Sequence, residues 1–242
     1  MSFGEVLVAG RPAAMRWSSL VLPTLALAAS LLISQTELDM TVQSWLWHGP
    51  DAGWTIDAKA ALPRALFYDG PKVLLVILGV AALLAAAAGY RVGKLRPFRR
   101  ELTFVGLALA LVPTVASNLK AVTDVYCPSQ LAAFGGRYAH VPPFHPHPEA
   151  DRQPGRCFPA GHASGGFALL ALAFVSRRRT YRLAGILAGL GAGGLMGAYQ
   201  MAKGAHFLSH TLTTAALAWL MIAVLALWMN LPRPGPGDTA CP

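Results

Sequence analysis

Charged residues are scarce in this sequence. Asp, Glu, Lys and Arg make up 13% of its 242 residues, and 55% are hydrophobic, whereas soluble domains carry about 25% charged residues. This shortage excludes an ordinary soluble domain and predicts an integral membrane protein. The net charge of +9 does not indicate nucleic-acid binding, because the basic residues gather in short links between apolar runs.

Two further patterns are lacking. The sequence shows neither an inverted repeat nor polar breaks in the middle of its apolar runs, and both are typical of secondary transporters. It also lacks a clean signal peptide, because the apolar run from Trp17 is long enough to span and no small-residue cleavage site clearly ends it. A transporter is therefore disfavoured.

Long apolar stretches, in contrast, are abundant. Six of them reach or approach the roughly 20 residues that cross a bilayer. They lie near residues 17–35, 72–90, 101–119, 160–176, 183–200 and 210–230. The sequence therefore predicts an all-α integral membrane protein, a six-transmembrane-helix bundle over residues 17–230. A cytoplasmic segment of residues 1–16 precedes the bundle, and a disordered cytoplasmic tail of residues 231–242 follows it.

The positions of Lys and Arg predict the orientation. They concentrate in the links 90–100 and 177–182 and near the N-terminus, and such clusters mark the cytoplasmic side. Both termini are then cytoplasmic, and segments 36–71 and 120–159 face the other compartment, which we expect to be the periplasm outside a bacterial inner membrane. The tryptophans and scattered charges of 36–71 suit one or two short interfacial helices, or an aromatic belt that anchors the spans.

The fifth stretch carries a glycine at every fourth position. These residues are Gly185, Gly189, Gly193 and Gly197. A face of this kind lets a neighbouring helix approach closely, so the pattern predicts a helix-packing surface.

Cysteines are few, and their spacing matches no metal-ligand pattern. Of the three, Cys127 and Cys157 bracket the outer segment, while Cys241 lies in the Pro- and Gly-rich tail. A disulfide between Cys127 and Cys157 is favoured because the periplasm is oxidising; two free buried thiols are the alternative. Cys241 is not a prenylation site, which would need a cysteine fourth from the end.

Three histidines lie in the same outer segment, at His140, His145 and His147. Imidazole is a common metal ligand, but no cysteine or carboxylate lies at a ligand spacing, and the intervening prolines make the loop stiff. We therefore expect no metal site and no cofactor, and keep metal binding by this loop as a minor alternative.

Polar residues form three clusters at the ends of predicted spans. They are Asn118, Lys120 and Asp124; Phe158-Pro159-Ala160-Gly161-His162; and Gln200, Lys203, His206 and His210. All three are predicted on the outer side, whereas chance would scatter them between both faces. Ionisable groups are expensive to keep in a membrane, so the clusters predict one functional site.

The second cluster has the features of an anion site. Pro159 can begin a helix, and the first-turn N–H groups of Ala160, Gly161 and His162 would then have no intrahelical partner. Gly161 has no side chain and lets a phosphate approach. His162 could donate a proton to a leaving oxygen.

These ordered motifs resemble the type 2 phosphatidic acid phosphatase superfamily of membrane lipid phosphatases. That family has a Lys, six residues and Arg-Pro; then Pro-Ser-Gly-His; then Ser-Arg, five residues, His, three residues and Asp. The corresponding residues here are Lys120 with Cys127-Pro128; Pro159-Ala160-Gly161-His162; and Tyr199-Gln200 with His206 and His210. The resemblance covers about residues 70–230.

The resemblance implies a six-span bundle that hydrolyses a phosphate ester or diphosphate of a lipid at the periplasmic face. Phosphatidate-type lipids, polyprenyl diphosphates and lipid A are candidate substrates. In such a bundle His206 attacks phosphorus and forms a phosphohistidine, and His162 is the general acid. Lys120 and the N–H groups near Ala160 and Gly161 bind phosphate oxygens. This scheme requires no metal.

Four motif residues depart from the family pattern. Cys127 and Gln200 replace the phosphate-binding arginines, Ala160 replaces a serine, and His210 replaces the orienting Asp. A neutral amide cannot replace a guanidinium that binds two phosphate oxygens. Lys203, near Gln200, is the candidate replacement charge, and His210 can accept a proton from the nucleophile's ring. Loop arginines are further candidates: Arg137, Arg152 and Arg156.

The departures leave several interpretations open. The chain is an active lipid phosphatase with a rewired pocket, a lipid phosphotransferase on the same scaffold, a histidine–metal enzyme, or an inactive protein that binds lipid. In the metal enzyme, His162, His206 and His210 would be the ligands. We favour the phosphatase because Lys120, His162 and His206 are retained together.

Overall fold

The computed structural model describes residues 17–148, 152–176 and 178–231. The predictions for residues 1–16 and for the tail, including Cys241, therefore lie outside the described residues. Eight α-helices are described: α1 (Val21–Ile33), α2 (Leu38–Leu46), α3 (Ala61–Arg64), α4 (Gly70–Ala88), α5 (Arg99–Thr123), α6 (Gly161–Ala168), α7 (Arg179–Ala202) and α8 (Leu208–Trp228). A π-helical turn, Ala65–Asp69, joins α3 to α4. Short 3₁₀ helices occupy Trp17–Leu20, Arg96–Phe98, Pro128–Gln130, Ala132–Phe134 and Leu169–Phe174.

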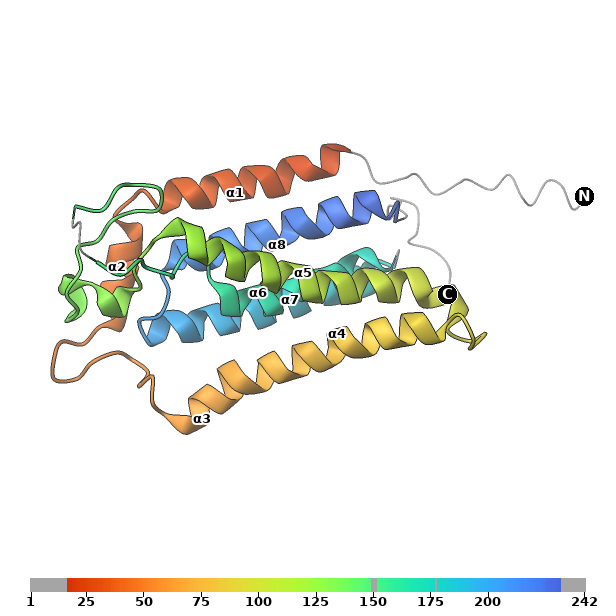
Figure 1. Ribbon diagram of the computed structural model, residues 1–242, viewed down its shortest axis with the longest axis horizontal. Helices are drawn as coiled ribbons and strands as arrows, with labels where there is room; N and C mark the ends of the chain where they lie inside the picture. Colours follow the sequence, from red (N-terminus) through yellow and green to blue (C-terminus); the bar gives the residue numbers. More distant parts are fainter. Residues whose placement is uncertain (1–16, 149–151, 177, 232–242) are drawn as a thin grey trace, which may run out of the picture.

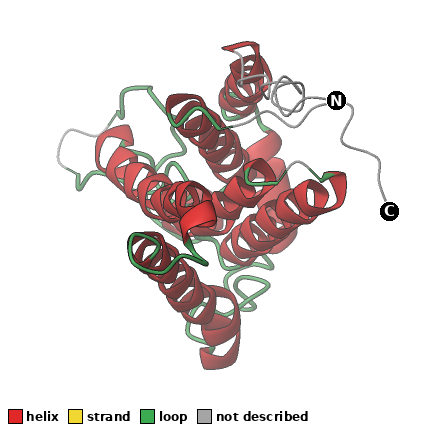
Figure 2. Ribbon diagram, turned by 90° about the vertical axis from the view of Figure 1, so that its right-hand side faces the viewer, coloured by secondary structure: helices red, strands yellow, loops and turns green. Residues whose placement is uncertain are grey.

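The long helices lie side by side, and the short α2 lies across one end of the bundle (Figure 1). Viewed along the bundle from the end opposite α2, the helices pack together and loops connect them (Figure 2). Within the described residues every named element of secondary structure is a helix. The prediction of an all-α protein is therefore confirmed.

Four helical segments are long and apolar enough to cross a membrane. They are Ala61–Ala88, Arg96–Gln130, Arg179–Ala202 and Leu208–Trp228. Helices α1 and α2 make a fifth if they are taken together, although they are bent by 70°. The fourth predicted span, near residues 160–176, corresponds to the shorter apolar helix Gly161–Phe174, whose second half is 3₁₀. The number of six spans and the sides of the membrane remain predictions.

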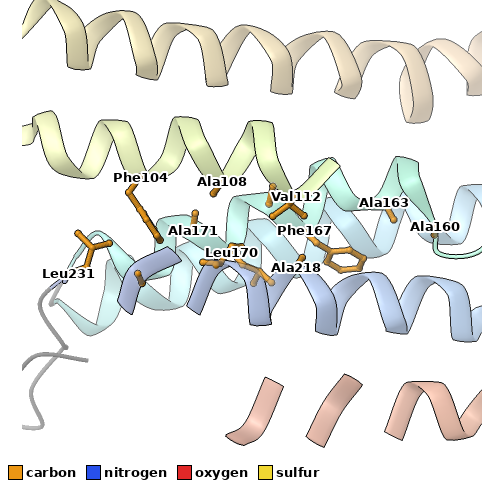
Figure 3. Close-up of a cluster of buried hydrophobic side chains, with 13 residues drawn as sticks. Phe104, Ala108, Val112, Ala160, Ala163, Phe167, Leu170, Ala171, Ala218 and Leu231 are labelled. Carbon is orange, nitrogen blue, oxygen red and sulfur yellow. The ribbon is translucent and has the colours of Figure 1, made fainter. Parts of the chain in front are cut away.

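Small side chains dominate the core between α5, α6 and α8. Ala108 of α5, Ala163 of α6 and Ala218 of α8 are each no more than 1% exposed, and Phe104 and Phe167 fill the space between them (Figure 3). Small residues let helix backbones approach closely where lipid removes the hydrophobic drive for association. This packing fixes α6, and with it the second motif, inside the bundle.

The glycine face of α7 packs as predicted. A Cβ atom at Gly185 or Gly189 would overlap the 3₁₀ segment Leu169–Phe174, and one at Gly193 would overlap the ring of Phe167. At Gly197 the neighbour is Thr211 of α8. The end of α7 is therefore held against α6 and α8 at the level where the third motif begins.

The segments 36–71 and 120–159 make defined packing contacts with each other. Trp47 and Trp54 pack against one another with ring centroids 5.0 Å apart, and Trp54 also contacts Phe134. Both tryptophans are half-buried and pack against a buried cluster that includes Phe207. The aromatic belt remains a prediction. The predicted disulfide between Cys127 and Cys157 is confirmed.

Candidate active site

The three predicted clusters meet at one end of the bundle, where α5 and α7 end and α6 and α8 begin (Figure 1). The Ala160 N–H donates a hydrogen bond of 3.4 Å to the carbonyl oxygen of His210. A Cβ atom at Gly161 would lie 3.2 Å from Nζ of Lys120. These contacts join the second cluster to the third and to the first. The structure thus places residues of the three clusters side by side, and their joint function remains a prediction.

Lys120 lies in the last turn of α5 and reaches over the first turn of α6. Its ammonium group, together with His162 and Lys72, lines one end of a cavity of about 450 Å³. Beyond this end the cavity runs between α4 and α5, along residues such as Val76 and Leu109. The cavity therefore has a cationic end at the motifs and an apolar remainder.

His162 lies in the first turn of α6, against the π-helical turn Ala65–Asp69. Its ring centroid is 4.1 Å from that of Tyr68. Nζ of Lys203 lies 4.8 Å from the Tyr68 ring and 4.9 Å from the Tyr199 ring. Burial lowers the pKa of Lys203 below its ordinary value. Lys203 is thus held by two aromatic faces near His162, which supports its place as a replacement charge.

Tyr68 was missed by sequence reasoning. It belongs to segment 36–71 and is separated from every motif along the chain. Hydropathy gives the depth of a residue along a span but not the side of the helix that faces a neighbour, so no signal in the sequence pointed to it.

His206 lies in the short loop between α7 and α8 and is 3% exposed. Burial lowers the pKa of His206 well below its ordinary value, and the nearby positive charge of Lys120 lowers it further. Its imidazole is therefore neutral at pH 7 and has a free nitrogen lone pair. Its Nδ1 lies 3.4 Å from Sγ of Cys157.

Helix α2 holds both ends of this loop. The buried carboxylate of Asp39 accepts hydrogen bonds from the backbone N–H (2.8 Å) and the hydroxyl of Ser209, in the first turn of α8. The amide of Gln43, one helical turn further on, donates to the carbonyl oxygen of Met201 (2.8 Å). Sequence reasoning also missed this pair. The available signal was two polar residues four apart on an otherwise apolar helix face.

Other predicted residues lie outside the site. Asn118 is exposed and donates to the carbonyl oxygen of Thr114. Asp124 forms an ion pair with Arg152, and this contact raises the pKa of Arg152. Arg152 is therefore engaged with a carboxylate and does not supply a free positive charge for phosphate. Of the first cluster, Lys120 is the residue that reaches the second.

The loop histidines have local partners. His147 Nε2 lies 2.7 Å from the carbonyl oxygen of Asp124. His145 Nδ1 lies 3.3 Å from the carbonyl oxygen of Pro143, and the ring of His140 packs edge-on against Phe207. Each of the three side chains therefore has a local contact within the described residues.

One group of side chains of metal-ligand type comes together in the part of the chain that is described. Its ligand atoms, from Cys157, His206 and His210, all lie within 4.8 Å of one another. Cys157 is bonded to Cys127, however, and a disulfide sulfur is not the thiolate that binds metals. The residues present do not fit a metal in this state. Neither the loop histidines nor His162 belongs to this group.

The altered motif positions have defined environments. Gln200 is 2% exposed at the end of α7. The ring of His210 contacts that of His206 edge-on, with centroids 5.7 Å apart. Its Nδ1 is buried and has no hydrogen-bond partner among the described residues. His210 therefore packs against the nucleophile candidate without the hydrogen bond that an orienting acceptor would make.

Comparison with known proteins agrees with the motifs. Residues 101–233, more than half of the chain, match the family model of the PAP2 superfamily. Searches of curated proteins and of solved structures gave no match. The matched region contains all three clusters, from Lys120 to His210.

Proposed function

Since the chain belongs to the PAP2 superfamily, we propose that it is a membrane phosphatase that cleaves a phosphate ester or diphosphate of a lipid. The observation that carries this proposal is the meeting of Lys120, His162 and His206 at one end of the bundle, beside a largely apolar cavity. In this proposal the bundle has six spans and cytoplasmic termini. Its site faces the periplasm from a bacterial inner membrane.

The proposed reaction uses His206 as nucleophile. Its neutral imidazole attacks phosphorus through Nε2, so that an N–P bond forms while the bond from phosphorus to the leaving oxygen breaks. His162 donates a proton to that oxygen. Water then attacks phosphorus and the N–P bond breaks, which restores the neutral His206. His162 accepts the proton that the water loses, and inorganic phosphate leaves. Burial of His206 supports this role because it favours the neutral form at pH 7.

Charge on the phosphate needs several partners. Lys120 lies over Gly161, where the first-turn N–H groups of Gly161 and His162 can bind a phosphate oxygen. The N–H of Ala160 is already directed at the His210 carbonyl, so Ala160 contributes less than its position in the motif implies. We propose Lys203 as the substitute for the arginine that Gln200 replaces.

The cavity supports a lipid substrate. Lys72 and Lys120 make one end of the cavity cationic, with His162 beside them, and the walls between α4 and α5 are apolar. A phosphate at the cationic end would leave an attached hydrocarbon chain in the apolar part. A small water-soluble phosphomonoester would leave that part unfilled.

The test is phosphate release from a panel of lipid phosphates by the purified protein, with and without EDTA. Release should survive EDTA and fall by about 10³-fold or more in His206→Ala, as expected when a nucleophile is removed. Release that is abolished by EDTA would favour the metal enzyme. Transfer of phosphate to an added alcohol without free phosphate would favour the phosphotransferase. Lipid binding without either reaction would favour an inactive protein.

A further inference from the structure

The nucleophile candidate lacks the acceptor that its family uses. His210 occupies the position of the orienting Asp, yet the centroid of its ring is 5.7 Å from that of His206 and its own Nδ1 has no partner among the described residues. A histidine that attacks through Nε2 must carry its proton on Nδ1, because each neutral imidazole has one N–H and one lone pair. Some other group must therefore accept the Nδ1–H.

The atom found beside Nδ1 of His206 is a sulfur. We propose that Cys157 is the positioning residue of the nucleophile: its Sγ accepts the hydrogen bond from Nδ1–H and fixes the tautomer in which Nε2 carries the attacking lone pair. This inference rests on the proposed function and names the group that takes the place of the missing carboxylate.

The direction of this hydrogen bond follows from the disulfide. The Sγ–Nδ1 distance is 3.4 Å, and both side chains are buried, with exposed fractions of 0% for Cys157 and 3% for His206. A thiol can donate or accept, but a sulfur bonded to a second sulfur has no hydrogen and can only accept. The bond to Cys127 therefore selects the tautomer protonated on Nδ1.

The sulfur is also held in place from two sides. The disulfide joins Cys157 to the residue just before the 3₁₀ turn Pro128–Gln130. The Cys157 N–H donates 2.9 Å to the carbonyl oxygen of Val125. An acceptor on a fixed backbone orients an imidazole more precisely than one on a mobile side chain.

Several groups besides the sulfur face His206. The groups that act on its charge are Lys120 from α5, His162 from α6 and His210 from α8, together with the backbone carbonyl of Cys157. That carbonyl faces the imidazoles of both His206 and His210. It is a second acceptor on the same residue, and a side-chain substitution leaves it unchanged. Experiments on the side chain therefore isolate the sulfur.

The chain supplies a matched pair of variants. Cys127→Ser and Cys157→Ser break the same disulfide and each leave one thiol, but only Cys127→Ser keeps a sulfur beside His206. We expect kcat for a lipid phosphate to be on the order of 10–100-fold lower in Cys157→Ser than in Cys127→Ser, with similar KM values, because small displacements of a reacting group have effects of this size. Equal kcat values in the two variants would overturn the proposal and leave the disulfide a purely structural role.

A second measurement does not depend on turnover. Histidine-selective ¹⁵N labelling reports which ring nitrogen carries the proton, and His206→Ala assigns the signal. Protonation of His206 on Nδ1 in the wild type supports the proposal if the preference weakens in Cys127→Ser, whose remaining thiol can also donate, and is lost in Cys157→Ser. Protonation on Nε2 in the wild type overturns it, whether or not the variants fold. If the wild type releases no phosphate from any lipid, the proposed function fails and the ¹⁵N spectrum still decides the hydrogen bond.

Discussion

The carboxylate of Asp39 accepts hydrogen bonds from the backbone N–H and the hydroxyl of Ser209, 170 residues away in the first turn of α8. An acceptor at this position satisfies an N–H group that has no intrahelical partner. Because Ser209 follows His206 by three residues, the same contact fixes the loop that carries the nucleophile candidate.

Asp39→Ala should therefore lower both stability and activity. A hydrogen bond to a charged group contributes about 1.5–3 kcal/mol, so we expect a loss of stability of this size and a clear drop in phosphate release. Thermal unfolding in detergent measures the first effect. Glu37→Gln, on an exposed carboxylate at the start of the same helix, is the control and should change neither quantity. An unchanged melting temperature in Asp39→Ala would contradict the capping role.

The glycine face of α7 predicts a position-specific effect. A Cβ at Gly193 would overlap the ring of Phe167, whereas one at Gly191 meets no atom within 4 Å. Gly193→Leu should separate α7 from α6 and displace the site, since overpacking costs about 1–3 kcal/mol or more. Gly191→Leu should fold and retain activity. Folding yield and phosphate release compare the two, and normal activity in Gly193→Leu would refute the packing argument.

The buried state of His206 predicts a pH dependence. Its folded pKa lies below the ordinary value of 6.5, so the neutral nucleophile persists as the pH falls through 6.5. The acid limb of kcat/KM should lie below pH 6.5. The unfolded chain binds a proton there that the folded chain does not, so this histidine makes stability decrease as the pH falls below 6.5. An acid limb above pH 6.5 assigned to His206 would contradict the burial argument.

The proposed role of Lys203 predicts that its replacement weakens substrate binding. If its ammonium group replaces a missing arginine, Lys203→Met should raise KM about tenfold or more, because a charge-assisted hydrogen bond contributes about 1.5–3 kcal/mol. Lys59→Met, on an exposed lysine of the loop before α3, tests for a general effect of net charge. Equal KM values in the two variants would remove Lys203 from the phosphate site.

The long helices and the shared end of the three clusters could be predicted from the sequence. Long apolar runs predicted α4, α5, α7 and α8. The positions of Lys and Arg predicted which helix ends lie on the same side. The partners that complete the site could not be predicted: Asp39, Tyr68 and the sulfur of Cys157 come from other segments. Hydropathy fixes how deep a residue lies, but contacts between helices depend on rotation and side-chain packing. The 3₁₀ segment Leu169–Phe174 could not be predicted either, because its composition is that of an ordinary apolar α-helix.

The cavity between α4 and α5 has a kinetic consequence. Val76 and Val80, which line it, are 58% and 51% exposed on the outer face of α4, so the cavity opens sideways toward the surrounding lipid. A lipid substrate would enter by two-dimensional diffusion within the leaflet. The rate of the proposed reaction would then follow the mole fraction of substrate in the bilayer rather than its concentration in the suspension, and adding inert phospholipid would slow it.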